Sequence, residues 1–211
     1  MVNTIKRLIF LPVLLTFACG IARGQDLQFG IKTGLSFATQ GIADPDILST
    51  NSVPTFNLYL YVEKPLRNDF YIQGALGIMG KGVTTYQNIL TTTVQLTYID
   101  IPVNLIYKFT LPNLGKLYVG GGPYLSVGIS GNTQFQNTNN SSGENVTFGS
   151  DQDYKRLDAG ADLTVGFEFN NRLTFNTNYA LELNNIAPDN NTDNTSSIKN
   201  RVFSIGLGFH F

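Results

Sequence analysis

The sequence is poor in charge and in the residues that usually bind metals. Only 14% of its 211 residues are charged, and the net charge is −1. It contains no cluster of Lys and Arg, which argues against nucleic acid as a partner. Cys19 is the only cysteine and His210 the only histidine. Because transition metals are usually held by several such side chains, we expect no metal site and no cofactor.

One predominantly apolar run is present, at the amino terminus, and it has too few residues to span a bilayer comfortably. Leu8 to Ala18 follow two basic residues, and Ala22 and Gly24 precede Gln25. This pattern predicts a secretory signal peptide over residues 1–24 and an exported domain over residues 25–211.

Cys19 raises the alternative of a lipoprotein signal, which Thr16 and Phe17 fit poorly. With cleavage before Gln25, the exported domain contains no cysteine and therefore no disulfide. Beyond the signal there is no apolar run of about 18 residues, so a transmembrane helix is not expected.

Apolar and polar residues alternate through most of the remaining chain. The ending RVFSIGLGFHF places five apolar residues on one face and small or polar residues on the other, which is the period of a β-strand. Eight such stretches have about 8 to 13 residues each, at or slightly above the length that a tilted strand needs to cross a bilayer. They cover residues 27–37, 56–63, 70–81, 98–109, 117–129, 157–169, 173–183 and 201–211.

The connections between these stretches alternate in length. Those at 63–69, 110–116 and 170–172 are short and rich in Pro, Asn and Gly, which is typical of tight turns. Long polar connections cover residues 38–55, 82–97, 131–156 and 184–200. The pattern predicts an all-β fold, an eight-stranded antiparallel up-and-down transmembrane β-barrel, with the amino and carboxyl termini in the periplasm.

The absence of tryptophan leaves Phe and Tyr to form any aromatic belt at the membrane surface. A water-soluble sandwich has no reason to collect exposed aromatics at one end of its strands, so the belt favours contact with lipid. The outward aromatics near the short-turn ends are Phe29, Phe70, Tyr107, Phe109, Phe167, Phe169, Phe175, Phe209 and Phe211.

Charges of both signs are predicted to point into the barrel. The interior of an eight-stranded barrel is just wide enough to be filled by side chains, so we expect these groups to pair as a plug. The alternative is that the acidic excess forms a cation path or a proton-linked switch. The predicted lumen charge network comprises Lys32, Glu63, Lys81, Asp100, Lys108, Asp158, Asp162, Glu168 and Glu182.

Enzymatic activity is not expected. Asp158 and Asp162 could serve in acid/base chemistry, but His210 belongs to the periplasmic end. A Ser/His/Asp unit therefore cannot form at the outer surface.

Two local features carry further expectations. Pro102 lies within a predicted strand and cannot donate a ladder hydrogen bond, which predicts a bulge. The polar segment 132–148 is either a solvated mobile loop or a surface for adhesion and partner binding.

The fourth and fifth predicted strands carry a family resemblance. YIDIPVNLIYKF (Tyr98–Phe109) and LYVGGGPYLS (Leu117–Ser126), with the opening FGIKTGLSF and the ending FSIGLGFHF, resemble the small outer-membrane β-barrel domain common in Bacteroidota, the PorT-like group. The resemblance covers nearly the whole exported chain and implies a fold and a location but no single reaction. Some PorT-like proteins belong to a protein-secretion machine, but no residue here carries that role over.

The last aromatics, Phe209 and Phe211, also resemble the signal by which barrel-assembly machinery recognises its clients; they could equally be rim aromatics. We therefore expect a non-enzymatic outer-membrane protein with a structural or interaction role in the envelope. Its expected contacts are membrane lipid, the assembly machinery and envelope proteins. The alternatives are a narrow channel for ions or small solutes and a subunit of a secretion machine.

Overall fold

The computed structural model describes residues 27–42, 49–87, 90–137, 140–188 and 197–211. The predicted signal peptide lies outside these residues. In the described part of the chain, no helix long and apolar enough to cross a membrane is found. The described strands are β1 (Gln28–Ile42), β2 (Ser49–Asn51), β3 (Val53–Pro65), β4 (Phe70–Gln87), β5 (Leu90–Leu111), β6 (Gly115–Gln136), β7 (Ser141–Asn145), β8 (Leu157–Phe169), β9 (Leu173–Glu182) and β10 (Ile198–His210).

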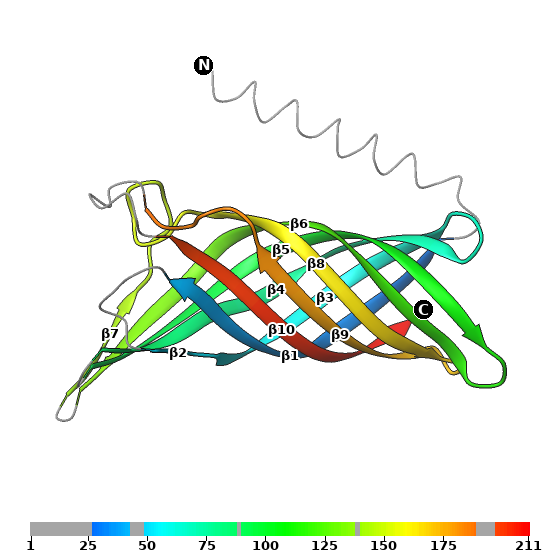
Figure 1. The fold of residues 1–211 in the computed structure, drawn as a ribbon, viewed down its shortest axis with the longest axis horizontal. Helices are drawn as coiled ribbons and strands as arrows, with labels where there is room; N and C mark the ends of the chain where they lie inside the picture. The colour runs from blue at the N-terminus through cyan, green and yellow to red at the C-terminus, as the bar shows by residue number, and fades with distance from the viewer. Residues whose placement is uncertain (1–26, 43–48, 88–89, 138–139, 189–196) are drawn as a thin grey trace, which may run out of the picture.

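Eight of these strands form a closed antiparallel ring (Figure 1). The order around the ring is β1, β3, β4, β5, β6, β8, β9 and β10, and β10 pairs back to β1. A closed ring leaves no unpaired sheet edge in the bilayer. The predicted eight-stranded up-and-down barrel is confirmed.

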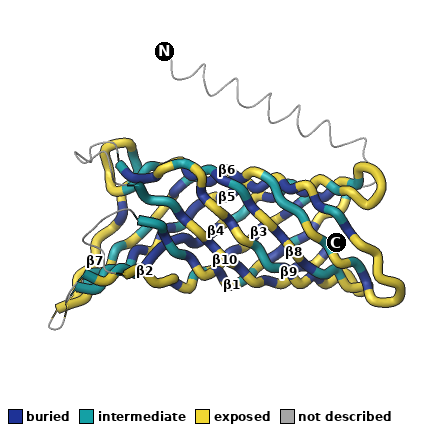
Figure 2. The backbone as a smooth tube through the Cα atoms, in the orientation of Figure 1, coloured by how far each residue is buried: buried dark blue, intermediate teal, exposed yellow. Residues whose placement is uncertain are grey.

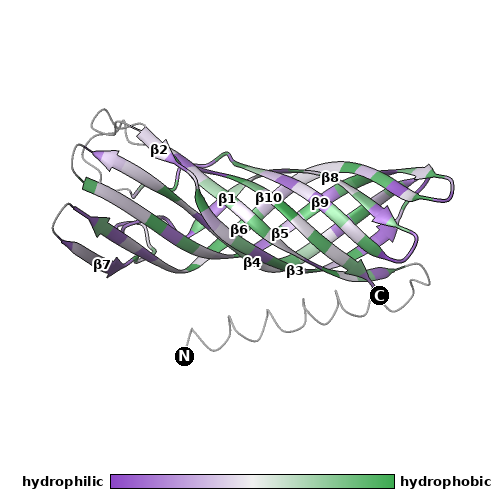
Figure 3. Ribbon diagram, turned by 90° about the horizontal axis from the view of Figure 1, so that it is seen from below, coloured by the Kyte–Doolittle hydropathy of each residue, from purple (hydrophilic) through white to green (hydrophobic). Residues whose placement is uncertain are grey.

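The alternating sequence explains which side chains face outward. In β10, Val202 and Ser204 are buried, whereas Phe203, Ile205 and Leu207 are exposed. The same alternation of buried and exposed positions runs along the other barrel strands (Figure 2). Hydrophobic positions recur over the body of the barrel, whereas β7 is hydrophilic (Figure 3). The exposed apolar residues form the surface that meets lipid.

The three short connections lie at the end of the barrel where the chain terminates (Figure 1). Each contains a residue with left-handed φ: Asn68 and Asp69 at 51° and 64°, Asn113 at 66° and Arg172 at 72°. Such angles allow the chain to reverse over few residues. The backbone N–H of His210 donates to the Arg172 carbonyl at 3.0 Å, which ties the last strand to this rim.

Seven of the nine residues of the predicted aromatic belt are exposed, and Tyr107 and Phe167 are half-buried. Phe70 and Tyr107, from neighbouring strands, have ring centroids 4.8 Å apart in an edge-to-face arrangement. Phe167 and Phe169 form a similar pair, also at 4.8 Å. Phe211 is 68% exposed, so the belt continues to the last residue.

The opposite end contains more sheet than the sequence predicted. The predicted loop at 82–97 is largely a hairpin in which β4 and β5 continue, with Thr84 opposite Thr93 and their hydroxyl oxygens 3.1 Å apart. β6 runs on to Gln136 and pairs with β7, and β2 pairs with β4. The prediction of polar loops was wrong here because Thr and Val favour strands and pair across neighbours even without strict alternation. Figure 1 shows this extension projecting beyond the rest of the barrel.

The predicted bulge at Pro102 was also wrong. The register shift in β5 lies between Thr97 and Tyr98, and Pro102 stays in register opposite Tyr124 of β6. Between β5 and β4, the pairs before and after Pro102 share one register, with Gly74 opposite Val103 and Gly77 opposite Asp100. Ala75 and Leu76, which lie between them, form no pair with β5. The missing proline N–H thus interrupts the ladder without inserting a residue.

Candidate functional site in the barrel lumen

The predicted charged residues all lie inside the barrel. Lys81, Asp100, Asp158 and Glu182 gather toward the long-loop end, and we call them the outer cluster. Glu63, Lys108 and Glu168 gather with His210 near the short turns, and we call these four the inner cluster. Lys32 and Asp162 lie between the two clusters.

The outer cluster is built on one fully buried ion pair. Lys81 Nζ of β4 lies 2.7 Å from Asp158 Oδ2 of β8, and both side chains are 0% exposed. Lys81 also donates to Ser126 Oγ at 3.1 Å, and Ser126 donates in turn to Asp100. The Tyr124 hydroxyl donates to Asp158 Oδ1 at 2.9 Å. These bonds join four strands across the lumen.

Three lumen carboxylates have no Lys or Arg nitrogen within 4.0 Å among the described ion pairs: Asp100, Asp162 and Glu182. A buried carboxylate without a cation is costly unless donors surround it. Those donors are the Tyr59 and Ser126 hydroxyls for Asp100, the Asn104 amide for Asp162 at 2.8 Å, and the Asn200 backbone N–H for Glu182.

The inner cluster shares one lysine between two carboxylates. Lys108 Nζ lies 2.5 Å from Glu63 Oε1 and 2.7 Å from Glu168 Oε2. His210 Nε2 lies 3.5 Å from the same Glu168 oxygen, and its ring packs edge-on against Tyr61 at 5.2 Å. The Glu168 side chain is 17% exposed, so this cluster reaches the rim.

Inward tyrosines, which the sequence analysis did not assign to the site, cover the lysines. Lys81 Nζ lies 4.8 Å from the ring centroid of Tyr98 and 4.7 Å from that of Tyr124. Lys108 Nζ lies 4.5 Å from the ring centroid of Tyr71. Aromatic faces attract cations at these distances. The signal was available, because each tyrosine occupies an inward position of its strand.

An apolar cap covers the outer cluster. Val83, Val94, Leu96, Tyr98 and Val146 form a buried group, with Ile42, Phe148 and Tyr154 packed against it. The ring of Phe148 meets that of Tyr98 edge-on at 5.7 Å. Val146 and Phe148 belong to the segment that the sequence left open as a mobile loop or a binding surface. These two residues contribute to covering the barrel mouth.

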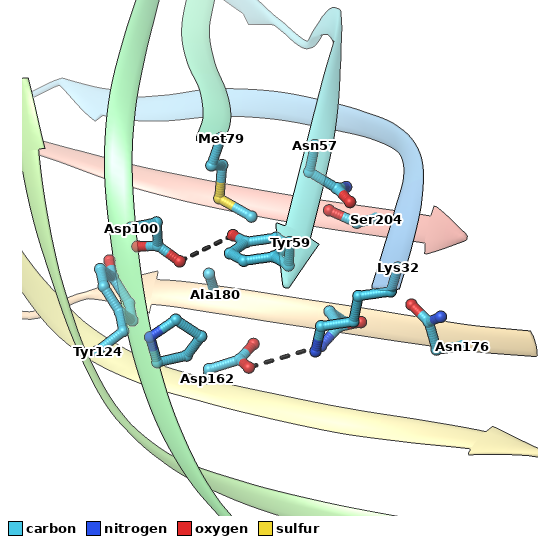
Figure 4. A pocket seen from close by; sticks show the side chains of 12 residues that line it. Lys32, Asn57, Tyr59, Met79, Asp100, Tyr124, Asp162, Asn176, Ala180 and Ser204 are labelled. Carbon is cyan, nitrogen blue, oxygen red and sulfur yellow. Dashed lines mark hydrogen bonds between the residues drawn. The ribbon is translucent and has the colours of Figure 1, made fainter. Parts of the chain in front are cut away.

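Two cavities lined by described lumen residues are small. A cavity of about 20 Å³ lies among residues including Lys32, Tyr59, Asp100 and Asp162 (Figure 4). A second cavity, of about 10 Å³, lies beside Lys32 and the inner cluster. A cavity needs roughly 10–15 Å³ to hold one water molecule. These two cavities therefore have room for isolated waters but not for a solute.

The described lysines of the two clusters pair with carboxylates of other strands. No group of three or more His, Cys, Asp or Glu side chains in the described part of the chain is placed to hold a metal ion. His210 contacts Glu168 and Tyr61, and no serine hydroxyl bonds to it among the described hydrogen bonds. The charged groups thus hold opposite walls of the barrel together.

A closed ring of strands, an apolar exterior and a filled polar interior define an integral outer-membrane β-barrel. The family model of the outer membrane protein beta-barrel domain matches residues 22–187, and the chain belongs to this family. Membership places it in the bacterial outer membrane. Among curated proteins, no significant match to the chain was found.

Several solved barrels are similar in fold. The attachment invasion locus protein Ail of Yersinia pestis is 15% identical, with a TM-score of 0.46, over 89% of this chain and 100% of that one. OprG of Pseudomonas aeruginosa is 14% identical, with a TM-score of 0.48, over 89% and 98%. The protease OmpT of Escherichia coli is 10% identical, with a TM-score of 0.40, over 90% and 98%. At these identities the likeness concerns the fold alone.

Proposed function

We propose that this protein is a closed, non-enzymatic barrel with a structural or interaction role in the cell envelope. The observation that carries the proposal is the filled lumen: buried ion pairs cross it, and an apolar cap covers its outer end. The narrow channel is disfavoured, because a conducting path would have to pass Lys81, Asp158 and the cap.

Planar-bilayer recording tests the closed lumen. The purified barrel is expected to give no stepwise conductance. A conductance that disappears on replacing Asp158 and Asp162 with Asn would show instead that the acidic lumen residues line a cation path.

The outer extension of β4, β5 and β6 with β7 is the surface that we propose for partner contacts. It projects past the barrel body, and Thr91, Gln134 and Ser142 are among its hydroxyl and amide side chains. An affinity tag between Asn137 and Asn140 would leave Phe211 free. Stoichiometric recovery of secretion or assembly proteins would support a role as a subunit of a secretion machine, which the resemblance to the PorT-like group suggests. Recovery of the barrel alone would support a free-standing structural protein.

The periplasmic position of both termini is also part of the proposal. Gln136 lies at the long-loop end and Asn171 in a short turn, and both are exposed. With Gln136→Cys, a membrane-impermeant maleimide should label intact cells, and with Asn171→Cys it should not. The reverse pattern would invert the assigned orientation.

We further infer that Phe209 and Phe211 assist assembly. Both are exposed at the rim, with ring centroids 6.0 Å apart. Deleting Phe211 should lower the amount of barrel that reaches the outer membrane, while Phe169→Ala, at the same rim, should not. Equal losses would make Phe211 a rim aromatic without a recognition role.

A further inference from the structure

The wall of the barrel has a weak point between β4 and β5. Gly74 pairs with Val103 and Gly77 with Asp100, but Ala75 and Leu76 have no partner in β5 within this otherwise continuous ladder. The backbone N–H of Lys108 donates to the Asp69 carbonyl on the β4 side at 3.0 Å.

Alternate residues of a strand direct their backbone groups to the same neighbour, so the even-numbered residues of β5 near Lys108 face β4. Pro102 is one of them and has no N–H to give. The donor is therefore missing at the position opposite Ala75. This accounts for the gap in the ladder.

An apolar groove of about 400 Å³ lies on the outer surface over this gap. Its rim is formed by outward residues that are 41–61% exposed, among them Phe29, Leu60, Leu76, Ile101 and Val103. The volume falls within the roughly 300–1,000 Å³ that small-molecule sites occupy.

A missing side chain produces the groove. Phe29 lies beside Val62, Val62 beside Gly74, and Gly74 beside Val103, so these four residues form one outward row across the strands. Every member of the row carries a large apolar side chain except Gly74. A Cβ atom built on Gly74 meets no heavy atom within 4 Å. Space for a larger side chain therefore exists at this point of the row.

The groove also comes close to the lumen. Pro102 lines both the groove and the larger lumen cavity, and Tyr61 lines both the groove and the smaller one. Both side chains are buried on the inward face of the barrel. Pro102 and Tyr61 therefore border the groove on one side and the lumen cavities on the other.

We propose that the groove is a seat for one hydrocarbon chain of a membrane lipid. It is continuous with the lipid-facing surface, and Phe29 of the aromatic belt lies on its rim. The groove therefore extends from the membrane interface along the surface that faces the acyl chains. A chain lying along Gly74 would fill the missing place in the row and contact Leu60, Leu76 and Val103. A second copy of the barrel fits less well, because its own convex apolar surface would bridge the rim rather than enter the groove.

The test uses the full-length protein in vesicles that contain a phospholipid with a photoactivatable diazirine on one acyl chain. After illumination, labelled residues are located by mass spectrometry. We expect labelling to concentrate on residues 60–62, 74–76 and 101–103. Gly74→Trp fills the groove and should abolish this concentration. Val165→Trp, on the lipid-facing side of β8 and 48% exposed, is the matched control and should leave it unchanged.

Folding of each variant is checked by the shift in gel mobility on heating, and Gly74→Leu provides a smaller filler if Gly74→Trp fails to fold. Labelling that is even around the barrel, or that survives a folded Gly74 variant, would overturn the proposal. Cross-linking of two barrels through the groove would also overturn it and would identify a second copy as the occupant.

Discussion

The two ends of the lumen compensate their buried charges in different ways. In the outer cluster, one lysine and one aspartate form an ion pair that is 0% exposed and lies beneath an apolar cap. In the inner cluster, Lys108 serves two glutamates, and Glu168 remains 17% exposed at the rim. The outer ion pair is thus fully buried, whereas the inner cluster is partly exposed at the rim.

The difference determines how much each charge matters for stability. A buried charge that loses its only partner keeps its full desolvation cost, whereas a charge near water can be rehydrated. Lys81 has one carboxylate within ion-pair distance among the described residues, but Lys108 has two. The contrast predicts that substitutions at the outer cluster are more damaging.

The largest effect is expected for Asp158→Asn. The substitution keeps the shape of the side chain but leaves Lys81 without a counter-charge, which should lower the free energy of unfolding by about 3–5 kcal/mol. The measurement is guanidinium unfolding in phospholipid vesicles, followed by circular dichroism. Asp162→Asn is the control, because no ion pair is described for Asp162 and its partners are the Asn104 and Asn178 amides. Equal losses in the two variants would contradict the special role of the Lys81–Asp158 pair.

Leu96→Ala tests the cap itself. Leu96 is 1% exposed at the centre of the apolar group, so its truncation should leave a cavity and cost about 2–5 kcal/mol. Ion conductance across the bilayer should stay absent, because the ion pairs beneath the cap remain. Leu183→Ala, at a 61% exposed position close to the same end, provides the control. A small loss of unfolding free energy for Leu96→Ala would mean that packing within the cap contributes little to the stability of the barrel.

A smaller effect is expected at the inner end, for Glu168→Gln. Lys108 keeps its contact with Glu63 at 2.5 Å, and the partly exposed rim allows water to replace the lost partner. The same unfolding measurement should show a loss of under about 1 kcal/mol. A loss of unfolding free energy as large as that of Asp158→Asn would show that the charges at both ends are equally shielded from water, and the contrast between the two ends would disappear.

The barrel itself could be predicted from sequence because its signal is local. Alternation over β10 or β9 assigns each side chain to lipid or lumen without knowledge of any other strand. The inward positions of the charged residues followed from the same rule. Their pairing did not, because Lys81 and Asp158 are 77 residues apart and meet only through the stagger of the closed ring.

The cap could not be predicted for a related reason. Val146 and Phe148 stand in a segment rich in Asn, Ser and Thr, where two apolar residues give no period. They become buried only because the extended β4–β5 hairpin supplies Val83, Val94 and Leu96 beside them. The groove at Gly74 likewise depends on Pro102, which interrupts the ladder in a strand distant in sequence from Phe29.

At neutral pH the smallest effect is expected for Tyr154, whose contribution to stability appears only at high pH. Tyr154 packs against the cap, outside the spanning strands, and burial raises its pKa to about 12. Between its ordinary value of about 10 and 12, the unfolded chain loses this proton while the folded protein keeps it, so stability falls as pH rises. The slope from this group is at most about 1.4 kcal/mol per pH unit. Tyr154→Phe should flatten the unfolding free energy in this range relative to the unsubstituted protein, whereas Tyr86→Phe, at an exposed position, should not. If the unfolding free energy of Tyr154→Phe kept the same dependence on pH, water would have to reach the Tyr154 hydroxyl. The cap would then be less well buried than the Lys81–Asp158 ion pair.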